Sequence, residues 1–319
     1  MIMGNIINPR NIANCRILVV GDVMLDSYWY GKVNRISAEA PVPIIHIQSK
    51  DKRLGGAANV ALNIKKLGAD VTLLTVVGCD EAAINIKKLL SDSEIETYFA
   101  EDIDMETIIK LRIIGQGQQM LRIDFEKEPD KEVMAVVVEH FHELIQNHDI
   151  VIFSDYGKGG LEHIRQMLQM AQDAGKPTFV DPKGNEWTRY CGATLITPNL
   201  SEFLQVVGPC SSEMEIENKA LELIIKLKLS AMLLTRSKDG MKLIETESVV
   251  SIPSEAREVS DVTGAGDTVI ATLAVMFACT SDLVESTKIA NKAAGIVVGK
   301  FGTAAVSYDE LFESSYDES

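Results

Sequence analysis

Residues 261–268 read Asp-Val-Thr-Gly-Ala-Gly-Asp-Thr, and they place a glycine-rich turn directly before a carboxylate and an apolar run. Gly264 and Gly266 allow the backbone to turn sharply and to approach an anion closely. The apolar residues 269–277 predict a helix whose free N–H groups and positive dipole end would face that anion. Asp267, at the start of this helix, would then be a general base that takes a proton from a hydroxyl during phosphoryl transfer.

The backbone N–H groups of the turn would complete this catalytic centre. Those of Gly264, Ala265 and Gly266 would stabilise the charge on the transferring phosphoryl group. An isolated glycine turn more often only connects two elements, so a second pattern is needed to support this interpretation. Residues 54–61, which read Leu-Gly-Gly-Ala-Ala-Asn-Val-Ala and are followed by further glycines at set spacing, supply it.

These two patterns, far apart in the chain, resemble the two signatures of the ribokinase/PfkB family of carbohydrate kinases. The second departs from the family pattern only at Thr272, where a smaller residue is usual. The resemblance implies a ribokinase-like α/β fold, in which a doubly wound, mostly parallel sheet carries a small antiparallel β lid. It also implies phosphorylation of a sugar hydroxyl with ATP and Mg²⁺, and leaves the need for a monovalent cation open.

The composition favours a soluble α/β enzyme. At 319 residues the chain can bury a core without a disulfide or metal, and we expect a single ribokinase-like domain over residues 1–319. The five cysteines are scattered and contain no CxxC pair, which predicts reduced, buried side chains in a cytoplasmic protein. The net charge of −15, and the lack of a signal peptide or membrane-spanning run, argue against nucleic acid and membranes as partners.

Apolar runs that alternate with helical patterns predict βαβ units with right-handed crossovers. Residues 16–21 form the first expected strand, which puts Asp22 and Asp26 just beyond its carboxyl end, where open α/β sheets bind ligands. The further strands are expected at 71–77, 149–154, 177–181, 193–197 and 230–235. The helices are expected at 57–67, 81–90, 131–147, 161–174, 199–207 and 213–228.

Two segments, about 41–54 and 95–126, break this alternation and are rich in β-branched residues. Gln116-Gly117 offers a turn between two strands of the second segment, so we expect a small antiparallel sheet. The polar side chains expected on one face of this hairpin are Lys110, Arg112, Arg122 and Asp124. They predict a lid over a polar ligand, and an edge hairpin with a solvated face is the alternative.

Further segments sharpen the resemblance to one branch of the family, the D-glycero-β-D-manno-heptose 7-phosphate kinases of ADP-heptose synthesis. The matching segments are 21–31, 35–43, 154–159, 181–184, 197–202 and 297–303. The resemblance implies that the anomeric hydroxyl of the heptose 7-phosphate is phosphorylated to the 1,7-bisphosphate, on the route to lipopolysaccharide. Another PfkB-type sugar or sugar-phosphate kinase, ribokinase-like or phosphofructokinase-like, is one alternative. A non-catalytic sugar-phosphate or nucleotide sensor is the other.

In many bacteria such a kinase is the amino-terminal half of a protein whose other half is an adenylyltransferase. This chain has no GxFDxxHxGH-like motif of nucleotidyl transfer, so it is either a stand-alone kinase or half of a longer protein. The resemblance implies a sugar phosphate and ATP as small-molecule partners. It also implies a fused or separate adenylyltransferase and a homodimer formed through the lid.

The sugar is expected to contact residues of both glycine patterns and of the first strand's end. Asp22 and Asn59 offer an acceptor and a donor to sugar hydroxyls, and Asp26 is a further sugar ligand. Gly55 and Gly56 would allow the sugar to approach the backbone. A satisfied turn Asp and an Asn on a helix face are the alternatives.

The 7-phosphate of the sugar requires cations. Those offered by the lid are Lys110, Arg112 and Arg122, and Lys158 and Arg35 are further choices. An arginine could grip the phosphate with two hydrogen bonds, whereas a lysine would act as a point charge. Each of them could instead be a solvated surface residue.

Asn199 and Glu202 match the family's NxxE pattern, which the resemblance implies organises Mg²⁺ and phosphates, through waters as Mg²⁺ prefers. A helix-capping box is the structural alternative. Lys183 is expected at the ATP phosphates. The residues expected around the nucleotide are Thr235, Arg236, Ser237, Asn291, Gly295, Gly302 and Thr303.

Overall fold

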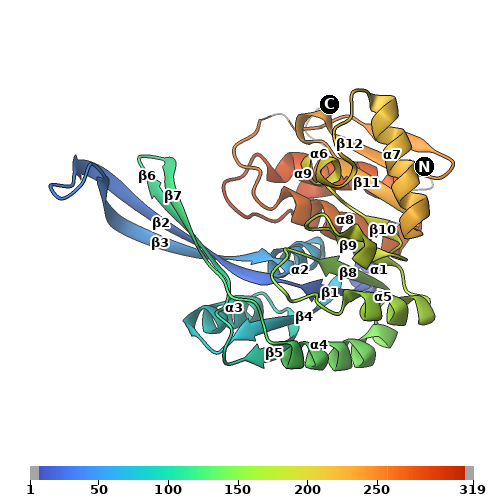
Figure 1. Cartoon of the computed structure of the whole chain (residues 1–319), viewed down its shortest axis with the longest axis horizontal. Helices are drawn as coiled ribbons and strands as arrows, with labels where there is room; N and C mark the ends of the chain where they lie inside the picture. The colour runs from blue at the N-terminus through green and yellow to red at the C-terminus, as the bar shows by residue number, and fades with distance from the viewer. Residues whose placement is uncertain (1–6, 257, 313–319) are drawn as a thin grey trace.

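The computed structural model describes residues 7–256 and 258–312, in which a large sheet with helices on both faces carries a smaller sheet (Figure 1). The large sheet has nine strands in the order β13-β12-β11-β10-β9-β8-β1-β4-β5. Neighbours from β11 to β5 pair in parallel, and β12 and β13 add an antiparallel edge. Its strands are β1 (Arg16–Gly21), β4 (Asp70–Gly78), β5 (Glu96–Asp102), β8 (Ile150–Ser154), β9 (Thr178–Asp181), β10 (Leu195–Ile196), β11 (Ala231–Thr235), β12 (Met241–Glu245) and β13 (Val249–Ile252).

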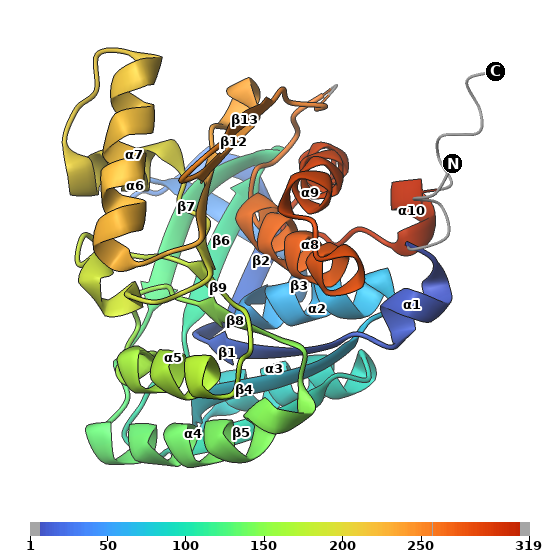
Figure 2. The same ribbon diagram turned by 90° about the vertical axis from the view of Figure 1, so that its right-hand side faces the viewer.

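Helices cover both faces of this sheet, which explains why its central strands are apolar runs rather than alternating patterns (Figure 2). One apolar cluster lies under α1, α2, α3, α8, α9 and α10, and the other under α4, α5, α6 and α7. The bounds of the helices are α1 (Pro9–Ala13), α2 (Ala57–Leu67), α3 (Glu81–Asp92), α4 (Lys131–Leu144), α5 (Ile164–Asp173), α6 (Leu200–Val207), α7 (Glu213–Leu227), α8 (Ala265–Thr280), α9 (Leu283–Val297) and α10 (Tyr308–Phe312). The expected doubly wound, mostly parallel sheet is confirmed.

The order in which the chain adds strands to the large sheet reverses between β1 and β8. After β1 the chain builds β4 and β5 on one side, and it then crosses to β8 and continues to β13 on the other side. In open α/β sheets ligands bind outside the carboxyl ends of the strands at such a reversal. The residues that follow β1 and β8 are therefore expected to border the site.

The small sheet extends from the carboxyl end of β1 and has the order β3-β2-β6-β7 (Figure 1). Its strands are β2 (Val23–Ile36), β3 (Pro43–Gly56), β6 (Ile109–Gly115) and β7 (Gln118–Phe125). The expected turn at Gln116-Gly117 joins β6 to β7 with two positive φ angles, 54° and 78°, as a two-residue hairpin requires.

Two expectations about the lid were wrong in part. The lid sheet is mixed rather than antiparallel, because β6 leaves the body in the same direction as β2 and pairs with it in parallel. Residues 96–102 are not lid but the edge strand β5, since their apolar side chains pack on the body. Sequence reasoning left residues 23–36 without a strand. They form β2, and β2 and β3 are the two longest strands of the lid.

The cysteines are free, but the expectation that all are buried was wrong. Cys15 is buried, whereas Cys79 and Cys191 are exposed because they lie in loops that follow β4 and a short 3-10 turn. Cys210 and Cys279 are partly exposed. Among the helices of the described residues, none has the length and apolar character needed to cross a bilayer.

Candidate functional site

The glycine turn expected to bind an anion forms the start of α8. Gly264 caps the helix with φ 79°, and Asp267 lies in its first turn with only 4% of its surface exposed. A Cβ on Gly264 would lie 2.8 Å from Asn59 Nδ2, so both the φ angle and the close approach require glycine here. Residues 261–266 are called the anion turn below.

The Asp267 carboxylate is held from two sides. Asn59 Nδ2 donates to its Oδ2 over 2.7 Å, and the Tyr156 hydroxyl donates to its Oδ1. Burial raises the pKa of Asp267 to about 6, although both hydrogen bonds act to lower it. Asp267 is therefore ionised at neutral pH and is a stronger base than an exposed aspartate, which suits proton abstraction from a hydroxyl.

Asn59 is positioned by neighbouring helices. Asn63 Nδ2 donates to the Asn59 carbonyl over 2.9 Å, and Thr268 Oγ1 donates to Asn63 Oδ1 over 3.0 Å. This chain of hydrogen bonds ties α2 to α8 beside the base. Asn59 thus orients Asp267, and its use as a sugar ligand stays a prediction.

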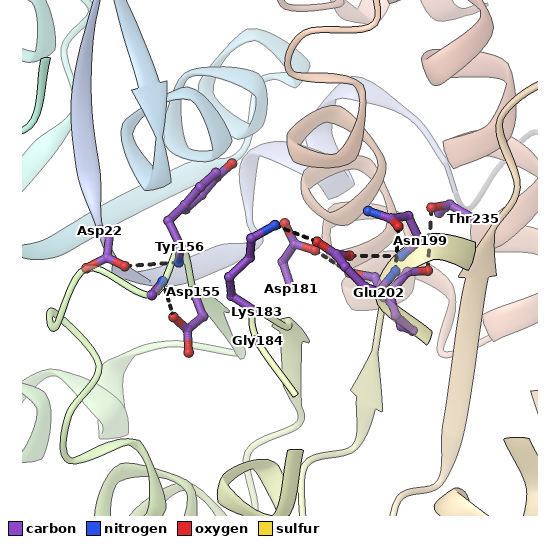
Figure 3. Close-up of polar contacts among 12 residues, drawn as sticks. Asp22, Asp155, Tyr156, Asp181, Lys183, Gly184, Asn199, Glu202 and Thr235 are labelled. Atoms are coloured by element: carbon purple, nitrogen blue, oxygen red, sulfur yellow. Dashed lines mark hydrogen bonds and ion pairs between the residues drawn. The ribbon is translucent and has the colours of Figure 1, made fainter. Parts of the chain in front are cut away.

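Asp22 organises a loop. Its Oδ2 accepts from the backbone N–H group of Tyr156 (Figure 3). The same oxygen accepts from the N–H group of Lys158, and Oδ1 accepts from that of Gly160. Burial, reinforced by nearby Asp155, raises the pKa of Asp22 to about 6. Both oxygens of Asp22 accept backbone hydrogen bonds, so Asp22 forms the turn, and its contact with a sugar stays a prediction.

Asp26 faces the site from β2. It is 2% exposed, and its Oδ1 forms an ion pair with Arg112 Nη1 over 2.6 Å. A Cβ on Gly55 would lie 2.6 Å from Asp26 Oδ2, so glycine is needed for the two strands to pack at this point. Gly56 follows at φ 60° and leads into α2. The predicted sugar residues Asp26, Gly55, Gly56 and Asn59 are therefore brought together.

The lid cations share one face, as predicted. Lys110 pairs in register with Asp124, and Arg112 pairs with Arg122. Lys110 Nζ lies 5.4 Å from the centre of the Tyr156 ring, and its ammonium has no ion-pair partner among the residues that the structure describes. Burial lowers the pKa of Lys110, while the Asp26 charge opposes that effect.

The other predicted phosphate ligands are further from the base or already paired. The Arg112 guanidinium lies over the Tyr28 ring at 5.1 Å and forms its ion pair with Asp26. Arg122 is exposed and pairs with Asp124 over 2.9 Å, and Lys158 pairs with Glu126 over 2.6 Å. Arg35 lies exposed at the far end of β2.

Asn199 and Glu202 form the capping box that was the structural alternative. Asn199 Oδ1 accepts from the Glu202 N–H over 2.9 Å, and Glu202 Oε2 accepts from the Asn199 N–H over 3.1 Å (Figure 3). Glu202 Oε1 also forms an ion pair with Lys183 Nζ over 2.8 Å. The cap leaves one Glu202 oxygen directed at Lys183, so the structural role is observed and the phosphate-site role stays a prediction.

Asp181, at the carboxyl end of β9, is a site residue that sequence reasoning did not single out. Burial and the nearby charges of Asp267 and Glu202 raise its pKa well above its usual range, and Lys183 opposes them. The hard carboxylate oxygens of Asp181 and Glu202 fit Mg²⁺. In the described part of the chain no three His, Cys, Asp or Glu side chains converge as a ready metal site, so Mg²⁺ here would also need water and phosphate oxygens.

A cleft of about 370 Å³ opens beside the anion turn, between β11, β12 and α9. Its lining includes the expected nucleotide residues Asn199, Thr235, Ser237, Gly266, Asn291 and Gly295. A second cavity of about 530 Å³ is lined by Tyr156, Lys183, Gly184, Arg189, Asn199 and Glu202 among others. Asn199 lines both, so the two cavities adjoin at this residue, and together they are called the phosphate track below.

Three residues expected around the nucleotide, Arg236, Gly302 and Thr303, do not line that cleft. Arg236 forms an ion pair with Glu213 of α7, which directs its guanidinium away from the cleft. Gly302 supports the anion turn instead, since its N–H donates to Asp261 Oδ2 over 2.9 Å. Thr303 lies beside Gly264, and its buried hydroxyl has no hydrogen-bond partner within residues 7–256 and 258–312.

Comparisons with known proteins agree with this geometry. The model of the pfkB family carbohydrate kinases matches residues 15–310. The chain is 48% identical over 297 residues to the bifunctional protein HldE of Pasteurella multocida, covering 93% of this chain and 62% of that protein. It is 48% identical over 304 residues to the HldE of Aeromonas hydrophila, covering 95% of this chain and 64% of the relative. The chain thus spans less than two thirds of the length of these relatives.

Solved structures show the fold. Phosphofructokinase-2 from Escherichia coli in complex with potassium superposes with a TM-score of 0.81 at 18% identity, covering 94% of this chain and 97% of that one. Ribokinase from Arabidopsis thaliana complexed with ribose and ATP gives 0.75 at 20% identity, covering 94% and 98%. These matches confirm the ribokinase-like fold.

Proposed function

Because this chain belongs to the pfkB family of carbohydrate kinases, we propose that it transfers the γ-phosphoryl group of ATP to D-glycero-β-D-manno-heptose 7-phosphate. The anomeric hydroxyl would be the acceptor, and the products would be the 1,7-bisphosphate and ADP. The observation that carries this proposal is the buried Asp267 carboxylate at the start of α8, next to the anion turn. The heptose assignment is supported by the heptose-kinase segments and by the 48% identity to HldE.

Asp267 would take the proton of the anomeric hydroxyl as its oxygen attacks the γ-phosphorus. Gly266 offers a backbone N–H group at the helix start, where it would stabilise a developing negative charge without reorganisation, whereas the N–H of Ala265 already donates to the Val262 carbonyl over 3.2 Å. Lys183, tied to Glu202, would neutralise phosphate oxygens along the phosphate track. Mg²⁺ supplies further charge neutralisation of the phosphates when bound, and Asp181, Asn199 and Glu202 would hold it, chiefly through water.

The sugar would lie between Asp267 and the lid. Asp26 and the backbone at Gly55 and Gly56 border this space, and the lid places Lys110 over it. We assign the remote phosphate to the lid cations, with Lys110 and Arg112 closest to the base and Arg122 further along the same face. Binding the far phosphate would orient the anomeric hydroxyl toward Asp267.

The lid also supports the proposal of a homodimer. Its exposed apolar side chains include Ile36 at 62%, Leu121 at 53% and Met120 at 44% exposure. A second copy of the lid would cover them. Light scattering of an Ile36→Asp/Leu121→Asp variant should give a monomer if this is correct, whereas a wild-type monomer would refute it. A fused or separate adenylyltransferase and a cytoplasmic location remain parts of the same proposal.

The substrate is tested by coupled ADP formation with Mg²⁺ and ATP over heptose 7-phosphate, fructose 6-phosphate and ribose. We expect turnover efficiency to be highest with the heptose phosphate. Equal or better use of ribose would overturn the heptose assignment, and use of fructose 6-phosphate alone would favour a phosphofructokinase-like enzyme. A chain that binds sugar phosphate but never forms ADP would be a sensor.

A further inference from the structure

Tyr156 contacts the predicted base and the lid at once. Its backbone is fixed by Asp22, and its ring extends away from that carboxylate (Figure 3). Its hydroxyl donates to Asp267 Oδ1, and the Lys110 ammonium lies over its ring at 5.4 Å. None of the roles derived above uses this side chain.

The Tyr156 hydroxyl lies where an acceptor hydroxyl would have to meet the base. Asp267 is 4% exposed, and Asn59 already occupies its Oδ2, so Oδ1 is the oxygen left for proton abstraction. Because the Tyr156 hydroxyl already donates to that oxygen, a water molecule would have to compete with it for the base. Burial and the Asp267 charge raise the pKa of Tyr156 well above its usual range, so the phenol stays a hydrogen-bond donor.

We propose that Tyr156 is a positioning residue that guards Asp267: its hydroxyl occupies the acceptor position until a sugar displaces it. This inference rests on the proposed kinase function. The reaction it suppresses is transfer to water, in which a water oxygen bonds to the γ-phosphorus as the bond to the bridging oxygen of ADP breaks. The water proton would go to Asp267, and phosphate and ADP would leave.

The contact with Lys110 links this guard to the lid. A remote phosphate that attracts the Lys110 ammonium would draw it off the Tyr156 ring, since a cation–π contact is weaker than an ion pair with phosphate. Sugar-phosphate binding would then loosen Tyr156 at the moment when the acceptor hydroxyl arrives. An unphosphorylated sugar would lack this effect.

The test uses the full chain with Tyr156→Phe, which removes only the hydroxyl. Tyr98→Phe is the matched control, because Tyr98 donates to Glu96 on the edge strand away from the site. ADP formation from MgATP without sugar should rise about tenfold in Tyr156→Phe, the size expected from losing one hydrogen bond to a charged group. It should return to background in Asp267→Asn/Tyr156→Phe and stay at the wild-type level in Tyr98→Phe.

A second readout is the pH profile of sugar-dependent turnover. The charged and titratable groups that face Asp267 are Asp26 from β2, Lys110 from β6, Asp181 from β9 and Tyr156 itself. Tyr156→Phe leaves the other three in place and removes a hydrogen bond that lowers the Asp267 pKa. The acid limb of the profile should therefore move to higher pH.

If Tyr156→Phe leaves both the sugar-free ADP formation and the acid limb of the pH profile unchanged, the proposed role of Tyr156 is refuted. Tyr156→Met, which keeps apolar bulk without a hydroxyl, repeats the test if the phenylalanine variant unfolds, as judged by thermal unfolding. The proposed kinase function fails separately, if wild-type protein shows no sugar-dependent ADP formation at all.

Discussion

Replacing Arg112 by Gln would remove the cation from a buried ion pair at the root of the lid. Arg112 is 9% exposed and Asp26 is 2% exposed, and their charged atoms lie 2.6 Å apart. Glutamine leaves the Asp26 carboxylate buried without its counter-charge. Breaking such a pair from one side costs about 3–5 kcal/mol in the free energy of unfolding.

At roughly 2 °C per kcal/mol for a large domain, this loss lowers Tm by about 6–10 °C. The assay is thermal unfolding of wild type, Arg112→Gln and Asp26→Asn/Arg112→Gln. The double variant should recover most of the loss because neither charge of the pair remains. Arg122→Gln is the control on the same face, where an exposed pair is worth at most about 1 kcal/mol.

The same variants report on function. Arg112→Gln should lower turnover efficiency with heptose 7-phosphate by more than about tenfold, equivalent to roughly 1.4 kcal/mol, while ATP affinity without sugar changes little. An Arg112→Gln protein with wild-type Tm and wild-type efficiency would refute the reasoning. Arg112 would then belong to a solvated face in solution.

Three further predictions follow from the geometry of the base and the phosphate track. Gly264→Ala should lower kcat by at least about tenfold with a smaller loss of stability, because its Cβ would displace Asn59 from the base and disturb the anion donors; an unchanged kcat would show that the turn tolerates a side chain. Sugar-dependent turnover should fall as pH drops through about 6, since Asp267 has a raised pKa and is inactive once protonated; a flat profile between pH 5 and 8, with stability confirmed, would exclude it as the titrating base. Lys183→Met should raise the KM for ATP severalfold, because it removes the cation that pairs with Glu202. Lys176→Met is the control. An equal rise of the KM for ATP in both variants would refute a phosphate role for Lys183.

The sequence predicted the body of the fold well because its signals are local. Apolar runs such as 16–21 and glycines such as Gly264 determine the backbone conformation of the residues next to them in sequence. The strands and the helix start could therefore be located without knowing the tertiary structure. The lid was harder to predict. Val23–Ile36 mixes polar, aromatic and apolar residues, and it becomes a strand only because β3 and β6 pair with it.

The site was predictable in part for the same reason. Asp267 and the anion turn are contiguous in sequence, whereas Tyr156 reaches Asp267 from 111 residues away and Arg112 reaches Asp26 from 86. No spacing rule connects such pairs. Asp22 accepts hydrogen bonds from three backbone N–H groups of the loop that carries Tyr156, a partnership visible only in three dimensions.

The most direct test of the account compares wild type with Asp267→Asn on the same preparation, by turnover with heptose 7-phosphate and by calorimetric binding of ATP and of the sugar phosphate. Asparagine nearly preserves shape but cannot accept the proton, and general-base catalysis typically contributes a factor of about 10²–10⁴. The account predicts a loss of turnover of at least that order with both affinities broadly retained. Near-native turnover of Asp267→Asn would contradict it, because the protein would then transfer phosphate without the base on which the whole site is built.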